Sequence, residues 1–186
     1  MLDQFLKDMW DILRLRYRNP EEYRYSPAVA AAVVLLLGVI NAAGMSALFG
    51  NSTAAIVFAV LLTALKWRVL AHMMRAVLRR SGAGDLPLVW FTLLSEALMI
   101  PMLLVMYVPQ LSPVGLFWQV WTFWVQAIGF MKMGNVSGWK VMLGYIAYFI
   151  GTLLAGTVLL LAFVQFGWLD AELLNQRLES IMGAAQ

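Results

Sequence analysis

The chain has 186 residues, of which 62% are hydrophobic and only 12% are charged. Soluble domains are nearer half apolar and a quarter charged, so this composition argues against a soluble globular domain and favours a membrane protein. The net charge of +3 gives little support to a nucleic-acid partner, and the lack of cysteines excludes thiol catalysis and Cys-ligated metals.

Residues 1–18 have the spacing of an amphipathic helix. One face collects apolar residues that recur every three or four positions: Leu2, Phe5, Leu6, Met9, Trp10, Leu13 and Tyr17. Two placements are open for this helix. It can lie in the membrane interface with Trp10 at headgroup depth, or it can pack on the protein's own cytoplasmic face.

Five apolar stretches follow, separated by four short gaps. We predict an all-α fold in which residues 27–167 form a polytopic membrane domain, because each stretch is near the roughly 20 residues that a bilayer requires. The expected spans are 27–49, 53–80, 87–108, 115–131 and 141–167. Ser26 and Pro27 fit the N-cap and first turn of the first span. Residues 1–26 form the cytoplasmic helix and hinge, and residues 168–186 form an acidic amphipathic tail.

Lys and Arg residues fall almost entirely on alternate gaps. Of the 13 in the chain, all but Lys66, Arg68 and Arg177 lie in the N-terminal segment, in the fourth gap, or beside the second gap at residues 75–80, where the second helix extends into the cytoplasm. Because Lys and Arg are retained in cytoplasmic loops, this distribution predicts a cytoplasmic N-terminus and a non-cytoplasmic C-terminus. We therefore expect a protein of the bacterial inner membrane.

Glu96 is the strongest candidate for chemistry, because an ionisable residue inside a span faces other helices or water. At about 1.5 Å per residue, Lys66 of the second span lies at a similar depth, and Arg68 is slightly shallower. Antiparallel helices joined by a short turn are neighbours, so Glu96 with Lys66 or Arg68 is a candidate intramembrane charge pair. A structural pair and a proton, ion or headgroup site both remain open. Pro101 should kink the same span.

Three further sets of residues are candidates for packing or binding. Small residues at four-residue steps define two faces that suit close helix packing or a partner: Gly38, Ala42 and Ser46, and Ala147, Gly151 and Ala155. Tryptophans at three-residue steps in the fourth span define a candidate surface for lipid or an apolar ligand: Trp118, Trp121 and Trp124. Asn41 is polar at mid-span and requires a partner within the protein.

Catalytic signatures are absent from the sequence, since there is no phosphate loop, paired acidic motif, His/Cys metal set or nucleophile elbow. We expect no catalytic residue, metal or cofactor, and a non-enzymatic structural or accessory component. Its partners would be membrane lipids and other integral membrane proteins or a second copy. The alternative is a small transporter or permease-like subunit that uses Glu96 for coupling or binding. A third hypothesis is a lipid-handling membrane enzyme with an acyl surface on the fourth span.

Two stretches also resemble a known family. One runs from Phe5 to Pro20 and ends in a proline before the first span. The other runs from Trp118 to Gly151 and combines an aromatic span, a short Gly/Ser loop and a span that carries Gly144 and Tyr145. In this layout the chain resembles bacterial relatives of the Yip family. The resemblance implies a cytoplasmic N-terminal segment followed by five spans, and it carries over no site residue.

Overall fold

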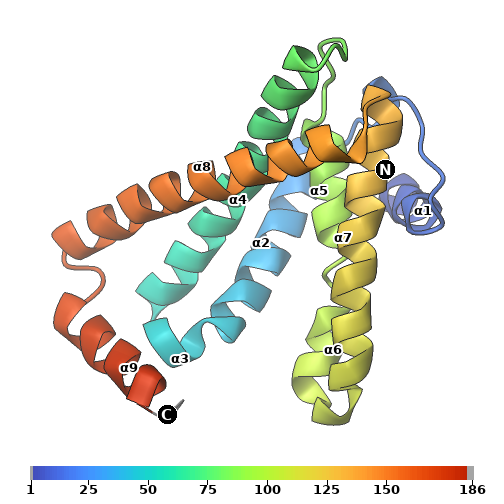
Figure 1. Cartoon of the computed structure of the whole chain (residues 1–186). Coiled ribbons are helices and arrows are strands. Elements are labelled where there is room, and N and C mark those ends of the chain that lie inside the picture. Colours follow the sequence, from blue (N-terminus) through green and yellow to red (C-terminus); the bar gives the residue numbers. More distant parts are fainter. Residues whose placement is uncertain (1, 184–186) are drawn as a thin grey trace.

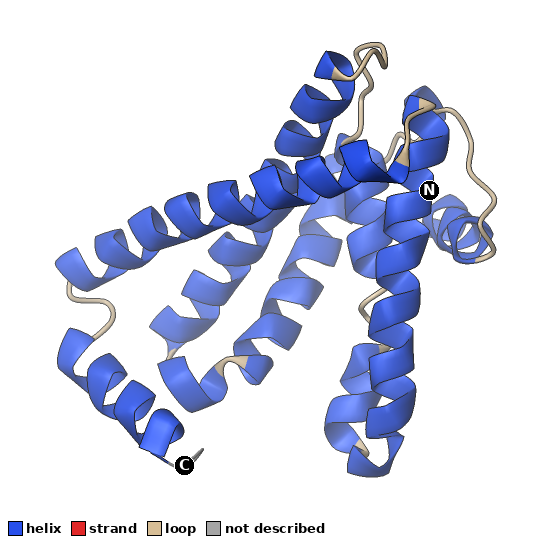
Figure 2. Ribbon diagram, viewed as in Figure 1, coloured by secondary structure: helices blue, strands red, loops and turns tan. Residues whose placement is uncertain are grey.

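The computed structural model describes residues 2–183, and this range is helical without any strand (Figure 2). Four helices are long and apolar enough to cross a membrane: α2 (Pro27–Gly44), α4 (Thr53–Arg80), α7 (Ser112–Gly134) and α8 (Gly138–Gln165). The chain therefore has an all-helical fold compatible with an integral membrane protein. Met1 and the last three residues of the expected tail lie outside the described residues.

The N-terminal helix is shorter than the expected 1–18, because α1 covers only Leu2–Leu13. Beyond it Leu15 has a left-handed backbone, with φ 61°. The N–H groups of Leu15 and Arg16 donate back to the carbonyls of Ile12 and Asp11, which closes the helix in a Schellman-type turn. The chain then reverses through a 3₁₀ turn, η1 (Pro20–Glu22). The prediction of a helix to residue 18 is wrong because the Schellman-type turn at Leu15 ends α1 at Leu13.

The start of α2 confirms the predicted cap. The Ser26 hydroxyl accepts the N–H of Val29 at 3.3 Å, and Pro27 occupies the first turn, where its missing N–H is harmless. The first predicted span is divided, however: α2 ends at Gly44, and a turn at Met45 leads into the short helix α3 (Ser46–Phe49).

The third predicted span is two short helices, α5 (Val89–Ala97) and α6 (Met102–Tyr107). Around the break between them, backbone N–H groups donate to the carbonyl three residues earlier. The N–H of Met99 donates to the carbonyl of Glu96, and that of Leu104 to the carbonyl of Pro101. Proline has no N–H and clashes with the preceding turn, so Pro101 favours a break at this point. Neither helix has the length of a membrane crossing. A second 3₁₀ turn, η2 (Pro109–Leu111), leads into α7.

Helix α4 packs against α2 on one side and α8 on another (Figure 1). Helices α6 and α7 form a separate arm beside this group, and α9 (Ala171–Gly183) returns against α3. At Gly38 of α2, an added Cβ would lie 2.7 Å from Cα of Val60 on α4, so only glycine permits this close approach. The N- and C-terminal ends lie at opposite ends of the structure (Figure 1).

Two lysines of the fourth gap contact the other two basic segments of the chain. The Lys132 ammonium donates to the carbonyl of Leu15 at 3.4 Å, and the Lys140 ammonium donates to the carbonyl of Ser81 at 2.9 Å. The N-terminal segment and the second and fourth gaps therefore lie at one end of the fold. Arg177, on α9, contacts the carbonyl of Leu48 at the opposite end.

Candidate functional site

Glu96 lies in the last turn of α5, directly before the helix break, and its partly buried side chain borders two cavities. One cavity, of about 160 Å³, lies between α5 and α7 and is also lined by Gln119 and Gln126. The other, of about 140 Å³, lies among α2, α4, α5 and α6 and is also lined by Asn41 and Lys66. Glu96 is thus a polar residue that lines both cavities, and its side chain lies between α7 and the helices α2, α4 and α6.

On the α7 side, Glu96 belongs to a hydrogen-bonded network. The Gln126 amide nitrogen donates to the hydroxyl of Ser95 at 2.8 Å and, more distantly, to a carboxylate oxygen of Glu96 at 3.4 Å. The Tyr145 hydroxyl donates to the amide oxygen of Gln126 at 2.8 Å. One amide therefore joins α5, α7 and α8. Sequence reasoning missed Gln126 and Tyr145, although a polar amide within an apolar span was the signal that singled out Asn41.

On the α4 side, Lys66 borders the same cavity as Glu96. None of the ion pairs between residues 2 and 183 joins these two side chains, so they share a cavity without a direct ion pair. Asn41 donates to the hydroxyl of Thr63 at 2.9 Å on the wall of this cavity, which confirms that Asn41 has a polar partner. Arg68 is exposed, with its guanidinium 5.8 Å from the ring centroid of the adjacent Trp67, and it borders neither cavity.

The three tryptophans of α7 lie in different environments. The indole nitrogen of Trp118 donates to the carbonyl of Leu98 at 2.7 Å, and this carbonyl lies within the break between α5 and α6. Trp121 is partly buried and stacks on Phe117, with ring centroids 6.5 Å apart. Trp124 is exposed. Steps of three residues rotate successive side chains by about 60° around a helix, so Trp118 and Trp124 lie about 120° apart around α7.

The glycine of each small-residue face, Gly38 or Gly151, packs against α4 of the same chain. Gly151 packs against Met73 and Val69 of α4, and a Cβ there would approach each of them at 3.1 Å. Ala147 and Ala155, on the same helix as Gly151, are partly buried. Ala42, on the same helix as Gly38, and Ser46, at the start of α3, are also partly buried. The Ser46 hydroxyl donates to the carbonyl of Ala43, one turn earlier, at 2.8 Å.

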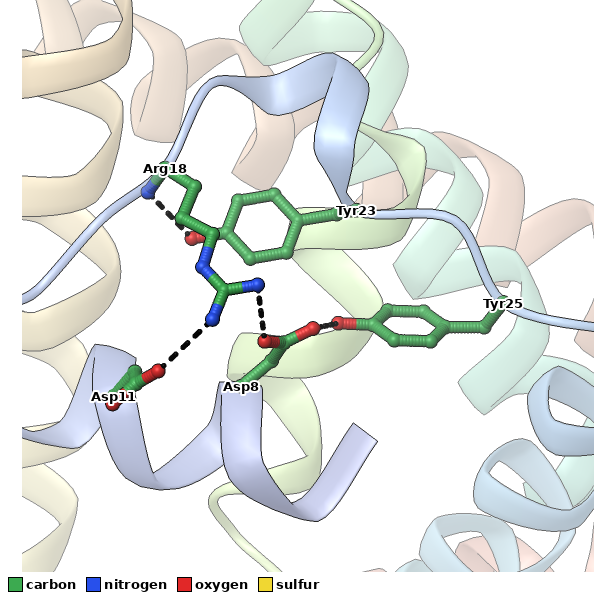
Figure 3. A network of polar contacts seen from close by, with 5 residues as sticks. All are labelled: Asp8, Asp11, Arg18, Tyr23 and Tyr25. Atoms are coloured by element: carbon green, nitrogen blue, oxygen red, sulfur yellow. Dashed lines mark hydrogen bonds and ion pairs between the residues drawn. The ribbon is translucent and has the colours of Figure 1, made fainter. Parts of the chain in front are cut away.

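The N-terminal segment contains a second polar network (Figure 3). Asp8 is 1% exposed, accepts the Tyr25 hydroxyl at 2.8 Å, and pairs with Arg18 at 3.1 Å. Arg18 also pairs with Asp11 at 3.3 Å, and its backbone N–H donates to the hydroxyl of Tyr23 at 3.0 Å. Burial raises the pKa of Tyr23 and Tyr25, so both hydroxyls stay protonated. These contacts hold residues 18–25 against α1.

This network corrects the predicted faces of α1. The predicted apolar face contains neither Asp8 nor Ile12, whereas the buried residues of the helix are Phe5, Asp8 and Ile12. That face packs against α5 and α7. Leu2, Leu6 and Trp10, expected on the same face as Phe5, are exposed.

The described residues hold no group of three or more His, Cys, Asp or Glu side chains that could bind a metal ion. No known family model, curated protein or solved structure matches this chain. The resemblance to the Yip family accordingly stays a prediction from the sequence, and the argument for function depends on the geometry around Glu96.

Proposed function

We propose that the chain crosses the bacterial inner membrane five times, with a cytoplasmic N-terminus and a non-cytoplasmic C-terminus. The opposite positions of the two ends support an odd number of crossings (Figure 1). The two short helices α5 and α6 would together form the third crossing, since they connect the basic end of α4 with the distant start of α7. The contacts of the fourth gap with the other two basic segments support the orientation.

We further propose that the protein is a small transporter or permease-like subunit that binds a small polar solute or an ion at Glu96. The observation that carries this proposal is that Glu96 and Lys66 border one cavity without a direct ion pair. A buried pair of opposite charges that served packing alone would favour direct contact, because each charge loses its hydration. A cavity of about 140 Å³ has room for water or a small polar guest between them.

The helix break beside Glu96 supports the same proposal. Membrane transporters commonly build binding sites where a spanning helix is discontinuous, because backbone groups freed from the helical pattern then face a cavity. Here α5 ends one residue after Glu96, and Met99 within the break borders both cavities.

A non-enzymatic accessory role is the second candidate, and the outer face of α8 favours it. Large apolar side chains are exposed along this helix, among them Ile146, Ile150 and Leu154. Lipid or another membrane protein would cover them. Purification of the tagged protein under native conditions would reveal a fixed partner by co-elution.

Cysteine accessibility tests whether the site is hydrated, and the chain is suited to it because it contains no native cysteine. We would introduce Thr63→Cys or Met99→Cys in the cavity, and Leu154→Cys on the outer face of α8 as the control. Charged methanethiosulfonate reagents react with the thiolate, which forms in water and not in hydrocarbon. We expect modification of the two cavity positions and none at residue 154. Unmodified cavity cysteines in a folded protein would refute a solute site at Glu96.

Charge substitutions separate binding from packing. If the charges of Glu96 and Lys66 serve packing alone, Glu96→Gln and Lys66→Met should each lower expression, and the double variant should recover it. If Glu96 binds a solute or ion, Glu96→Gln alone should leave a folded protein with altered cavity labelling. Glu179→Gln, on α9, is the matched control.

A further inference from the structure

A third cavity, which Glu96 does not line, lies beside the loop that follows α1. Its volume is about 580 Å³, and it is an open cavity lined by residues 15–19, by Glu22, and by Lys132 and Met133 at the end of α7. This volume is within the range of about 300–1,000 Å³ typical of small-molecule sites. Three of its lining side chains are cations and one is a carboxylate: Arg16, Arg18, Lys132 and Glu22. The cavity therefore favours an anion.

The loop that forms this cavity is held in place from two sides. The Tyr17 hydroxyl donates to the carbonyl of Val125 on α7 at 2.7 Å, and the Lys132 ammonium lies 5.4 Å from the centroid of the Tyr17 ring. On the other side, Arg18 is held by the carboxylates of Asp8 and Asp11 (Figure 3). A fixed loop lowers the ordering cost when a ligand binds.

The cations retain free donors. Arg16 is exposed and its side chain has no hydrogen-bond or ion-pair partner in the part of the chain that the structure describes. Lys132 has three N–H donors and uses one of them on the carbonyl of Leu15. Guanidinium and ammonium groups form charge-assisted hydrogen bonds to phosphate oxygens, which are among the strongest available in proteins.

The exposed face of α1 indicates where this cavity lies relative to a bilayer. Leu2, Leu6 and Trp10 follow one another at four-residue steps and are 60%, 53% and 54% exposed, while the opposite face of α1 is docked on α5 and α7. An outward apolar row ending in a tryptophan suits the headgroup region, with its leucines toward the acyl chains. The cavity loop begins directly after this helix, so with α1 in this position its cations would lie at the depth of lipid phosphates.

We propose that this cavity binds the phosphate of an anionic phospholipid headgroup, with Arg16 and Lys132 as its principal ligands and Arg18 as a third cation positioned by Asp8. The site would fasten the N-terminal segment to the lipid surface. It is independent of the solute site at Glu96, because no residue that lines this cavity lines either of the two cavities at Glu96.

The test uses the full chain in phosphatidylcholine nanodiscs, with retained lipid counted by native mass spectrometry as phosphatidylglycerol is added. The pocket variant is Arg16→Gln with Lys132→Gln. The matched control is Arg79→Gln with Arg80→Gln, which removes two exposed cations at the same end of the fold. We expect the wild type and the control to retain phosphatidylglycerol selectively. The pocket variant should require about tenfold more lipid for each cation removed.

Three outcomes would overturn the proposal. Equal losses in the pocket and control variants would mean that diffuse surface charge attracts the lipid. Competition by millimolar inorganic phosphate without any preference for phosphatidylglycerol would make free phosphate the ligand. Failure of Arg16→Lys with Lys132→Arg, which preserves both charges, to keep selective binding in a folded protein would refute recognition by these cations.

Discussion

Replacement of Asp8 by alanine should release the N-terminal helix from the membrane domain. Asp8 is buried and is the acceptor for the Tyr25 hydroxyl and the partner of Arg18. A buried hydrogen bond to a charged group contributes about 1.5–3 kcal/mol. The Arg18 side chain is 37% exposed, so loss of its ion pair adds at most about 1 kcal/mol. We therefore expect Asp8→Ala to lower the free energy of unfolding by about 1.5–4 kcal/mol.

The assay is reversible unfolding in mixed micelles, combined with hydrogen exchange of the backbone amides in residues 2–25. The control is Asp3→Ala, since Asp3 is exposed in the first turn of the same helix and has only the favourable dipole interaction, worth about 0.3–1 kcal/mol. Tyr25→Phe completes a double-mutant cycle. If the hydrogen bond contributes as argued, the coupling energy between Asp8 and Tyr25 should exceed about 1 kcal/mol.

Two results would refute this reasoning. The first is an Asp8→Ala protein whose unfolding free energy lies within about 0.5 kcal/mol of the Asp3→Ala control. The second is a coupling energy near zero, because the Tyr25 hydroxyl would then be satisfied by something other than Asp8. Faster hydrogen exchange in α1 without a change in global stability would instead locate the effect in local undocking of the helix.

Three further predictions test other contacts. Gly38→Leu should destabilise the α2–α4 contact by about 1–3 kcal/mol or more, because the leucine side chain would overlap the backbone of α4. Gly44→Ala is the control and should be tolerated, since a Cβ there meets open space. Thermal unfolding measures the stability of both variants. Trp118→Phe should cost about 1 kcal/mol by leaving the carbonyl of Leu98 without its indole donor, and Trp124→Phe, at an exposed position, is its control. Burial and the Asp8 hydrogen bond raise the pKa of Tyr25 above its ordinary 10.0, so the stability that Tyr25 contributes below about pH 10 is lost at higher pH. A pH series of unfolding free energies should therefore show a smaller alkaline loss of stability in Tyr25→Phe than in the wild type. An equal alkaline loss in both proteins would contradict the assignment.

The helical class and several helix boundaries were predictable because they depend on local sequence. A long apolar run has few alternatives to a helix in a membrane, since every backbone N–H and C=O must be satisfied internally. Ser26 and Pro27 marked the start of α2, and the second expected span, 53–80, has the bounds of α4. Pro101 likewise indicated a kink, and the structure has a break beside it.

Periodicity alone did not predict which face of a helix would be buried. For α1 the spacing separated an apolar from a polar side, yet the docked face carries Asp8 and leaves Leu6 exposed. The acceptor role of Asp8 depends on Tyr25 and Arg18, which reach it only after the chain reverses beyond Leu15. A buried carboxylate is stable when such partners surround it, and a helical pattern contains no information about them.

For Glu96, too, the sequence predicted the residue, and only the packing of the helices determined its neighbours. An ionisable residue within an apolar stretch is expensive in a membrane, and this made Glu96 a candidate before any fold was considered. The fold decided its neighbours: Lys66 shares its cavity, Gln126 and Ser95 form its network, and Arg68 lies apart. Two residues along a helix rotate a side chain by about 200°, so only the packing of α4 against α2 and α5 determines which cation faces the carboxylate.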